Sequence, residues 1–288
     1  MTRSNKFIKQ RYDVCVFERL TGKELLILKS NFRYWFADPF LFEKKDGSFY
    51  CFVELMDNHV KRGQIAVYDS LTKKTSVVVS DRVHMSFPFI FEKEGTVYMI
   101  PETSAAKELR LYEASSFPFE WKLAKVLLRD RMVVDSVLIF RDSAVFLVLY
   151  DIASKPYCLE VYQFNWDRLE VGDFVDRVED PEKIFRPAGG AFEVNGATIF
   201  PTQKGTKSYG EDVIFNQISL GKKTTIRASN IKVAYPSIAT KYDHKHTYNE
   251  TQHLAVLDFS KLVFSPIQVI DGLPCTIRRK FQKERSDD

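Results

Sequence analysis

Short apolar runs separated by polar turns recur along the chain. Four hairpin-like units, each an apolar run, a turn near Gly or Ser, and a second apolar or alternating run, span residues 36–55, 86–103, 134–151 and 187–204. A fifth, weaker unit covers 246–258. When Phe42, Phe91, Ile139 and Phe192 are aligned, the spacings are 49, 48 and 53 residues. A period of about 50 residues in a chain of strands and turns predicts an all-β, five-bladed β-propeller, with one four-stranded sheet per repeat.

The ends of the chain are expected to close this ring. The strands YDVCVFERL and ELLILKS have no hairpin register of their own, so they should complete the last blade together with KLVFSPIQVID. Closure removes exposed sheet edges. The segment YPSIATKYD is expected as an outer strand of blade four, and an alternative register starts blade five at Tyr235. Without Gly/Ser linkers or low-complexity tracts, residues 1–288 are predicted to be one domain.

Composition narrows the class of protein. Hydrophobic residues make up 45% of the chain and aromatic residues 14%, which excludes a disordered chain because so much surface can be buried. No apolar run reaches the roughly 20 residues that span a bilayer, and the N-terminus does not read as a secretion signal. The four cysteines are scattered, which excludes CxxC zinc or redox pairs and agrees with a cytoplasmic location.

Net charge is +4, and basic residues gather at both ends of the chain. A solvated tail is the simpler interpretation of the basic segment 278–285, and peripheral contact with an anionic membrane is the alternative. No motif supports binding to nucleic acid.

The register places acidic residues around one mouth of the central channel. Asp38 and Asp135 each lie four residues before their reference positions, at the start of the innermost strands of blades one and three. His246 takes the same place if the fifth blade begins there. The return strands bring four equivalent residues to this mouth: Glu54, Glu102, Tyr150 and Gln203. Converging carboxylates perturb one another's pKa values, which is typical of functional sites, whereas capping of strands or a structural ion is the alternative.

Neighbouring residues supply candidate ligand contacts. Arg186 precedes the innermost strand of blade four, where its guanidinium would contact an anionic ligand or pair with the acidic residues; the sequence leaves both open. Aromatic side chains offer stacking surfaces for a sugar. The expected set of substrate contacts is Arg186, Gln203, His246, Trp35, Tyr209 and Lys204.

The motif ADPFLF resembles the start of the five-bladed propellers of family 43 and family 32 glycosidases. This resemblance implies that Asp38 is the general base and that Asp135 tunes the pKa and orientation of a glutamic acid. The family's Glu-Gly-Pro is absent, so Glu102 and Glu54 are alternative general acids. The resemblance requires no cofactor for the reaction, and it implies a structural calcium ion or a water molecule in the channel, with His246 as its ligand.

A closer resemblance covers nearly the whole chain, through ADPFLF, FVE, SFPFIFE, YMIPET, VDSVLIF, RPAGG, PTQ, SYG and HTYN. These motifs are similar to a propeller domain of bacterial polysaccharide-biosynthesis proteins and to the N-terminal domain of plant glucosamine inositolphosphorylceramide transferases. The resemblance implies a role in the biosynthesis of cell-surface glycans or glycolipids. A sugar or nucleotide sugar would be the ligand, and a separate glycosyltransferase the partner.

Two functions follow from these residues. In the first, which we favour by a small margin, the domain is a glycosyltransferase or glycoside hydrolase-like enzyme acting on a glycosidic or sugar-phosphate bond. Asp38 would be base or nucleophile, Glu102 or Glu54 the acid, and Asp135 the tuning residue. In the second, the same mouth binds a sugar without chemistry and serves a partner enzyme. Open carboxylate pairs favour the first function, and carboxylates paired with Arg186 or Lys204 favour the second.

Overall fold

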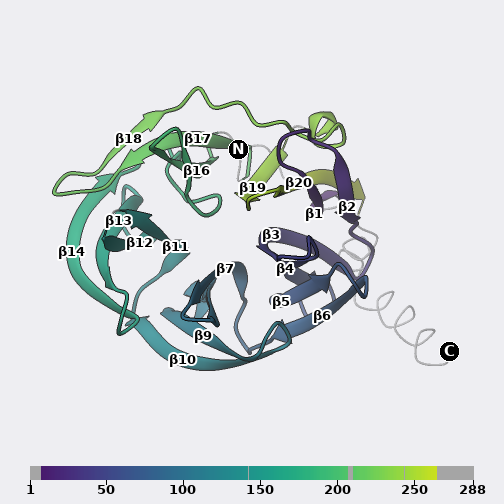
Figure 1. The fold of residues 1–288 in the computed structure, drawn as a ribbon, viewed down its shortest axis with the longest axis horizontal. Helices are drawn as coiled ribbons and strands as arrows, with labels where there is room; N and C mark the ends of the chain where they lie inside the picture. Colours follow the sequence, from purple (N-terminus) through teal and green to yellow (C-terminus); the bar gives the residue numbers. More distant parts are fainter. Residues whose placement is uncertain (1–7, 142, 207–209, 243, 265–288) are drawn as a thin grey trace, which may run out of the picture.

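The computed structural model describes residues 8–141, 143–206, 210–242 and 244–264. Its described strands form five four-stranded antiparallel sheets, and these are arranged as the blades of a ring around a central channel (Figure 1). The prediction of an all-β, five-bladed propeller is therefore confirmed. Among the described residues there are two single-turn 3-10 helices, Ser104–Ala106 and Ala239–Lys241, and no helix with the length and apolar character needed to cross a bilayer.

Blades one to four each take four consecutive strands, with the first strand innermost. Blade one comprises β3 (Tyr34–Glu43), β4 (Phe49–Asp57), β5 (Arg62–Asp69) and β6 (Lys74–Val79). Blade two comprises β7 (Ser86–Lys93), β8 (Thr96–Glu102), β9 (Glu108–Ser116) and β10 (Glu120–Arg129). Blade three comprises β11 (Val133–Arg141), β12 (Ala144–Asp151), β13 (Cys158–Asn165) and β14 (Glu170–Glu179). Blade four comprises β15 (Phe192–Val194), β16 (Ala197–Lys204), β17 (Asp212–Ser219) and β18 (Thr225–Ala228).

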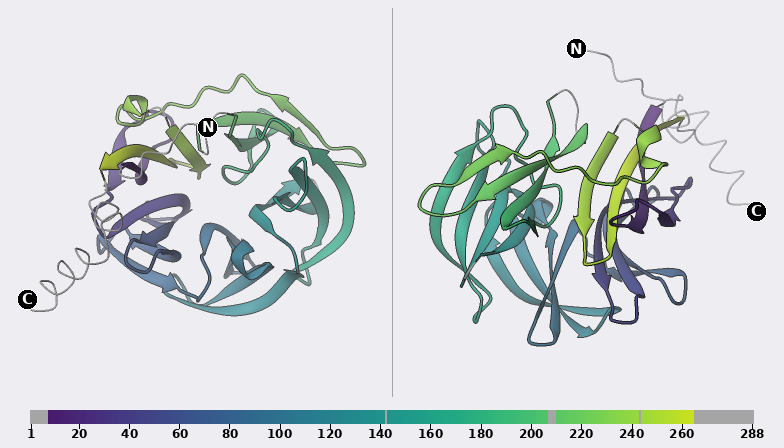
Figure 2. Two further views of the ribbon diagram at one scale, coloured as in Figure 1. Left: turned by 180° about the vertical axis from the view of Figure 1, so that it is seen from behind. Right: turned by 45° about the horizontal axis from the view of Figure 1, so that its top comes forward.

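Blade five is built from both ends of the chain. Its order is β19-β20-β1-β2, with β19 (His244–Glu250), β20 (Leu254–Phe264), β1 (Ile8–Glu18) and β2 (Glu24–Leu28). The pairing of β1 with β20 runs without interruption from Ile8 opposite Phe264 to Glu18 opposite Leu254. The predicted closure is confirmed, with KLVF as the end of β20; the residues that follow it lie outside the described part of the chain. Figure 2 shows this shared blade from two further directions.

The segment YPSIATKYD was expected to be an outer strand of blade four, and this prediction is wrong. The outer strand is β18, and residues 235–242 form a connection that contains a 3-10 turn. Pro236 has no backbone N–H to donate to a sheet, and its carbonyl accepts a hydrogen bond from the N–H of Ala239. The side chains of Tyr235, Ile238 and Tyr242 instead pack against the core of blade five. Blade five therefore begins with β19 and not at Tyr235.

The core lies between neighbouring blades, where the inner strands pack face to face. One large cluster joins blades two, three and four, and another joins the closing strands of blade five to blade one. In the second, Val14 and Val16 of β1 pack with Cys51 and Val53 of β4, and all four are completely buried. This packing and the strand pairing together fix the N-terminal strands in the ring.

A β-bulge near the start of the innermost strand recurs in four blades. The ladder skips two residues after Ala37, Ser86, Val134 and Lys245 in blades one, two, three and five. The first skipped residues are Asp38, Phe87, Asp135 and His246. A bulge re-aims a side chain relative to the sheet, and in blades one, three and five the residue it re-aims is polar: Asp38, Asp135 or His246.

Candidate binding site at the channel mouth

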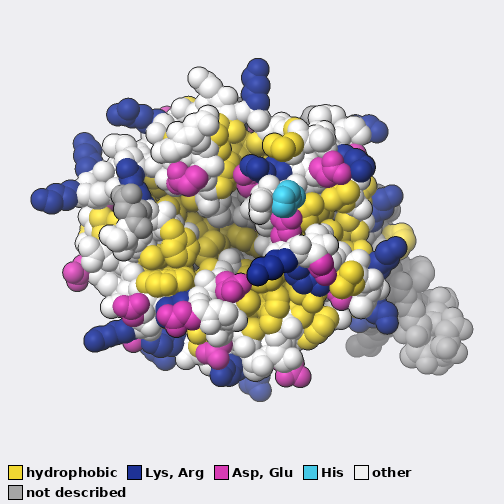
Figure 3. Space-filling view, in the orientation of Figure 1, with side chains coloured by type: hydrophobic (Ala, Val, Ile, Leu, Met, Phe, Trp, Pro, Cys, Tyr) yellow, Lys and Arg dark blue, Asp and Glu magenta, His cyan; other side chains and the backbone are white. Residues whose placement is uncertain are grey.

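The bulge positions form the base of the site. Asp38 and Asp135 adopt left-handed backbone conformations, with φ of 50° and 49°, and both side chains are buried. Non-glycine residues rarely adopt this conformation, which costs roughly 1–2 kcal/mol each. The sequence register correctly made these residues and His246 equivalent. Figure 3 shows one face of the ring hollowed at its centre, with acidic, basic and histidine side chains around the hollow.

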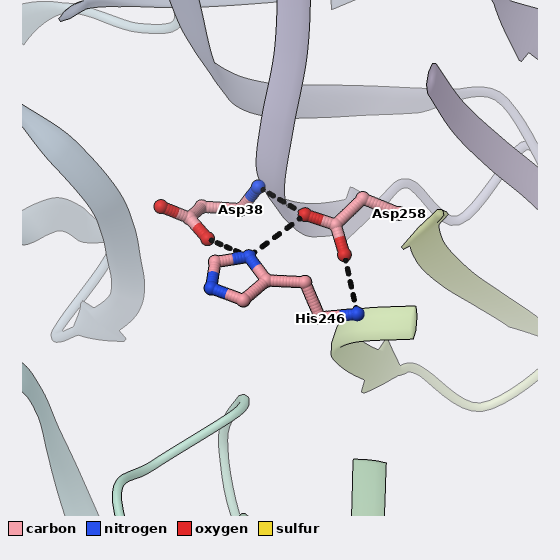
Figure 4. Close-up of side chains that lie close together, drawn as sticks. All are labelled: Asp38, His246 and Asp258. Carbon is pink, nitrogen blue, oxygen red and sulfur yellow. Dashed lines mark hydrogen bonds and ion pairs between the residues drawn. The ribbon is translucent and has the colours of Figure 1, made fainter. Parts of the chain in front are cut away.

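Asp38, His246 and Asp258 form a closed cluster between blades one and five (Figure 4). His246 Nδ1 lies 3.1 Å from Asp38 Oδ1 and 3.2 Å from Asp258 Oδ2. Asp258 also accepts hydrogen bonds from the backbone N–H groups of Asp38, His246 and Thr247, at 3.0, 3.2 and 2.7 Å. Asp38 accepts another from the N–H of Phe87, at 3.2 Å.

The charges in this cluster stabilise one another. Burial alone would lower the pKa of His246, but the carboxylates of Asp258 and Asp38 raise it to about 10. Burial opposes ionisation of Asp38, but His246, Arg186 and the Phe87 N–H together hold its pKa below the usual value. At neutral pH the cluster therefore places a protonated imidazole beside the ionised carboxylate of Asp38.

The resemblance assigned His246 to a calcium ion in the channel, and the chemistry of the cluster around this histidine does not fit that ion. Ca²⁺ takes six to eight oxygen ligands, whereas the two carboxylates here converge on an imidazole nitrogen. Asp258 already accepts three backbone hydrogen bonds. The imidazolium supplies the positive charge that a cation would bring.

Glu54 and Glu102 lie on the return strands beside this cluster, as expected. His84 Nδ1 accepts the N–H of Gly63 at 3.0 Å, so its Nε2, 3.4 Å from Glu54 Oε1, carries the proton. Burial and the nearby Asp38 and Glu102 raise the pKa of Glu54 well above its usual value. Glu102 accepts hydrogen bonds from the hydroxyls of Ser104 and Ser86, at 2.6 and 3.3 Å.

A second cluster joins blades three and four. Arg186 Nε donates to Asp135 Oδ2, and Arg186 Nη2 lies 3.7 Å from Glu102 Oε2. Gln203 Nε2 donates to the same Asp135 oxygen at 2.9 Å and to the carbonyl of Pro187 at 3.0 Å. Burial raises the pKa of Asp135 to about 7, against the lowering effect of Arg186 and with a further rise from Glu102. Of the two roles left open for Arg186, the structure shows pairing with acidic residues.

A cavity of about 340 Å³ opens beside this second cluster. Its lining combines aromatic, apolar, amide and basic side chains with two glycines, from Tyr150, Ile152, Tyr157, Lys183, Arg186, Gln203, Gly205 and Gly210. Tyr150 is held by a 2.8 Å hydrogen bond from its hydroxyl to Asp180, and Asp180 accepts the N–H groups of Ile184 and Phe185. Lys155 Nζ lies 3.6 Å from the ring centre of Tyr157, and Lys183 Nζ lies 5.6 Å from it.

The remaining predicted contacts lie in different places. Trp35 is half-buried and packs on Tyr12, with ring centres 5.5 Å apart, rather than offering an open platform. Lys204 is partly exposed and pairs with Glu211 at 3.1 Å, so it does not hold a carboxylate of the mouth. Tyr209 lies outside the described residues. The neighbouring Gly210 (φ +62°) lies against Tyr12 and His246 and also lines the cavity beside the second cluster.

Sequence reasoning missed Asp258 and Tyr12. Asp258 is a charged residue inside the apolar run LAVLDF, a signal of a buried partner that was available in the sequence. It was missed because its neighbour Phe259, not Asp258, takes the register position of Glu54. Tyr12 packs on the ring of His246, with ring centres 5.3 Å apart, and its hydroxyl is buried. Its place on a closing strand gave no indication of this role.

The fold defines a five-bladed propeller of the type found in glycoside hydrolases. The chain is similar to a thermostable family-43 glycoside hydrolase, with a TM-score of 0.56, 11% identity, and 80% of this chain and 89% of that one covered. It is also similar to the family-32 β-fructofuranosidase BmSUC1 of Bombyx mori, with a TM-score of 0.54, 12% identity, and 70% and 52% covered. Identities this low show the fold alone.

Sequence comparison gives the family. Residues 26–272 match the family model described as glucosamine inositolphosphorylceramide transferase 1, N-terminal, and the chain belongs to this family. It is similar to glucosamine inositolphosphorylceramide transferase 1 of Oryza sativa subsp. japonica, with 32% identity over 192 residues, 62% of this chain and 25% of that protein. The protein of that name from Arabidopsis thaliana is 28% identical over 264 residues, 85% and 32%. The chain thus spans a quarter to a third of the length of these relatives.

Proposed function

We propose that the channel mouth binds a phosphorylated sugar without transforming it, and that the domain presents this ligand to a glycosyltransferase. One observation carries the proposal: cationic side chains already occupy the carboxylates that catalysis would need. His246 pairs with Asp38, and Arg186 pairs with Asp135 and approaches Glu102. A general base or nucleophile engaged in an internal ion pair is a poor catalyst, but a rigid neutralised cluster is a good scaffold for hydroxyl groups.

The cavity beside Asp135 has the chemistry that a phosphorylated sugar requires. The rings of Tyr150 and Tyr157 offer apolar surface for the C–H face of a sugar, and Gln203 and Arg186 offer polar groups at its edge. Lys183, and Lys155 beside it on Tyr157, bring positive charge to the same side. Positive charge at the rim favours a phosphate over a neutral substituent.

The relatives' name refers to glucosamine and to inositolphosphorylceramide. For this chain we infer only the shared chemistry, a sugar or inositol ring next to a phosphate. This class includes free sugar phosphates, nucleotide sugars and phosphorylated lipid headgroups, and the binding experiment distinguishes them.

The experiment is calorimetric titration and thermal shift with inositol phosphate, glucosamine phosphate, a nucleotide sugar and the unphosphorylated sugars. Ligand at about 100 times its dissociation constant adds roughly 2.7 kcal/mol of stability. We expect phosphorylated ligands to bind and Lys183→Ala to weaken them about fivefold, an effect equivalent to one lost charge–phosphate contact. Lys222→Ala removes an exposed lysine elsewhere on blade four and is the matched control. Equal binding of neutral and phosphorylated sugars would contradict the phosphate part of the proposal.

A second function is favoured by one observation, the opposite pKa shifts of Glu54 and Asp38. A carboxyl group with a raised pKa, Glu54, beside one with a lowered pKa, Asp38, is the arrangement that acid–base chemistry at a glycosidic bond uses. In that case the protein would consume a nucleotide sugar or glycoside, and Asp38→Asn or Glu54→Gln would abolish turnover while the ligand still binds. Absence of turnover in the wild-type protein with ligand bound supports the recognition function instead.

A further inference from the structure

Two loops project from the rim of blade one on the side of the channel mouth. Residues 29–33 connect β2 to β3, and residues 58–61 connect β4 to β5. Tyr34 pairs with Asp57 and Ala37 with Glu54, so both loops extend beyond the strand ends that carry Asp38 and Glu54. At about 3.3 Å per strand residue, the loops lie roughly 13 Å beyond these carboxylates.

The two loops hold each other in position. The backbone N–H of Asn58 donates to the carbonyl of Arg33 at 2.8 Å, and the side chain of Asn58 donates to the carbonyl of Phe32 at 2.9 Å. Buried Arg11 donates to the carbonyl of Asn31 at 2.8 Å and lies over the ring of Phe32. The loops therefore form one supported surface.

Each loop exposes an apolar side chain next to a basic one. Phe32 is 70% exposed and Val60 is 48% exposed, and they are followed by Arg33 and Lys61. Lys29, Arg33 and Lys61 are exposed, and residues 29–33 and 58–61 contain no acidic residue. Asp57, at the end of β4, is buried and lies 3.5 Å from Arg33 Nε.

We propose that this rim, formed by residues 29–33 and 58–61, docks on an anionic membrane surface. Exposed apolar side chains flanked by cations match the interface of a bilayer, where apolar groups enter the acyl boundary and cations contact lipid phosphates. A protein partner would fit the apolar residues equally well, but the exposed basic side chains of Lys29 and Arg33 beside Phe32 favour an anionic lipid surface. Docking here would hold the channel mouth over the headgroup layer.

The inference goes beyond the proposed function, because it assigns a surface that the sugar site does not include. The test is vesicle flotation in the absence of any sugar, with phosphatidylcholine vesicles and with mixed phosphatidylcholine–phosphatidylserine vesicles. We expect binding to the mixed vesicles that falls with added salt. Phe32→Ser combined with Val60→Ser should weaken it by about tenfold or more, and Lys29→Gln combined with Lys61→Gln by about fivefold per charge.

Matched controls come from the opposite rim. Leu71 is 64% exposed in the turn between β5 and β6, so Leu71→Ser removes a similar apolar side chain away from the mouth and should leave vesicle binding unchanged. A positive readout uses tryptophan emission: Phe32→Trp should shift to shorter wavelength when mixed vesicles are added, and Leu71→Trp should not.

Three results would overturn the proposal. One is absence of binding to either vesicle, and another is equal loss of binding in the Leu71 and Phe32 variants. The third is binding that depends only on the basic segment 278–285 and survives every change in the two loops. Sugar binding measured on the same variants stays intact in all three cases if the proposed function holds, so the two ideas fail separately.

Discussion

On the side of the mouth formed by blades one and five, two carboxylates face one imidazole and are completely enclosed. On the side formed by blades three and four, Asp135 faces a guanidinium and an amide beside an open cavity. In both arrangements a buried carboxylate is paired with a cationic side chain. In the first, the cationic side chain, His246, does not line the cavity. The second shares its cation, Arg186, with the lining of the cavity. The first cluster therefore acts mainly on stability, and the second acts on stability and on ligand binding.

The largest expected effect is in the enclosed cluster. His246→Gln removes the positive charge that lies between Asp38 and Asp258, and breaking a buried ion pair in this way costs about 3–5 kcal/mol. Urea denaturation should show this loss in the free energy of unfolding. The double variant Asp38→Asn with His246→Gln should recover part of the lost free energy of unfolding, because it also removes the carboxylate charge that His246→Gln leaves unpaired. A cost below about 1 kcal/mol would show that the cluster is not ionised as described.

A smaller loss in the free energy of unfolding is expected when Arg186, the cation of the cluster beside the cavity, is removed. Arg186→Gln removes the cation from both Asp135 and Glu102, but the pKa of Asp135, about 7, lets this carboxylate take up a proton, so the cost in unfolding free energy should be about 1–3 kcal/mol. Binding of a phosphorylated sugar, measured by calorimetry, should fall at least about tenfold. Arg19→Gln is the control, because it breaks an ion pair with Glu250 at the opposite end of blade five and should leave ligand binding unchanged. If the Arg186→Gln variant still bound the ligand as well as the wild-type protein does, the cluster of Asp135 and Arg186 would not be part of the ligand-binding site.

The two clusters should also titrate in different ranges. The pKa of His246 is raised from 6.5 to about 10, so its stabilising contribution is complete below pH 6.5 and is lost progressively up to about pH 10. The pKa of Asp135 is raised from 3.8 to about 7, so stability falls as pH rises between those values. Unfolding measured against pH should lose the alkaline slope in His246→Gln and the acidic slope in Asp135→Asn. Unchanged slopes in both variants would contradict the assignments.

The smallest loss of unfolding free energy is expected at Gly210, which contacts the first cluster and lines the cavity beside the second. Gly210 has φ of +62°, and an added Cβ would lie 3.0 Å from the Tyr12 hydroxyl and 3.1 Å from His246 Cδ2. Gly210→Ala should cost about 1 kcal/mol from backbone conformation, with a small addition from crowding. Gly47→Ala, also at positive φ but with open space around its Cβ, separates the two causes, since it should show the backbone cost alone. Equal costs at both positions would show that crowding adds nothing.

The blades could be predicted because each repeats a local pattern of apolar runs and turns, and the repeat also gave the shared position of Asp38, Asp135 and His246. Pairing between blades could not be predicted in the same way. The Arg186 contact with Asp135 joins residues 51 positions apart, and no local pattern marks one partner over another. The connection at 235–242 was misassigned because its alternating apolar residues resemble a strand, although they pack on blade five without joining a sheet.

The pairing of Ile8 with Phe264 has a consequence for chain connectivity. Paired residues on antiparallel strands lie about 5 Å apart, so a short turn from Phe264 to Ile8, in place of the segments outside them, together with a new opening between β6 and β7, would give a circular permutant with little distortion. In that permutant every blade would consist of consecutive strands, and only side-chain packing between blades would close the ring. Its stability relative to the natural order would therefore measure how much the shared blade contributes.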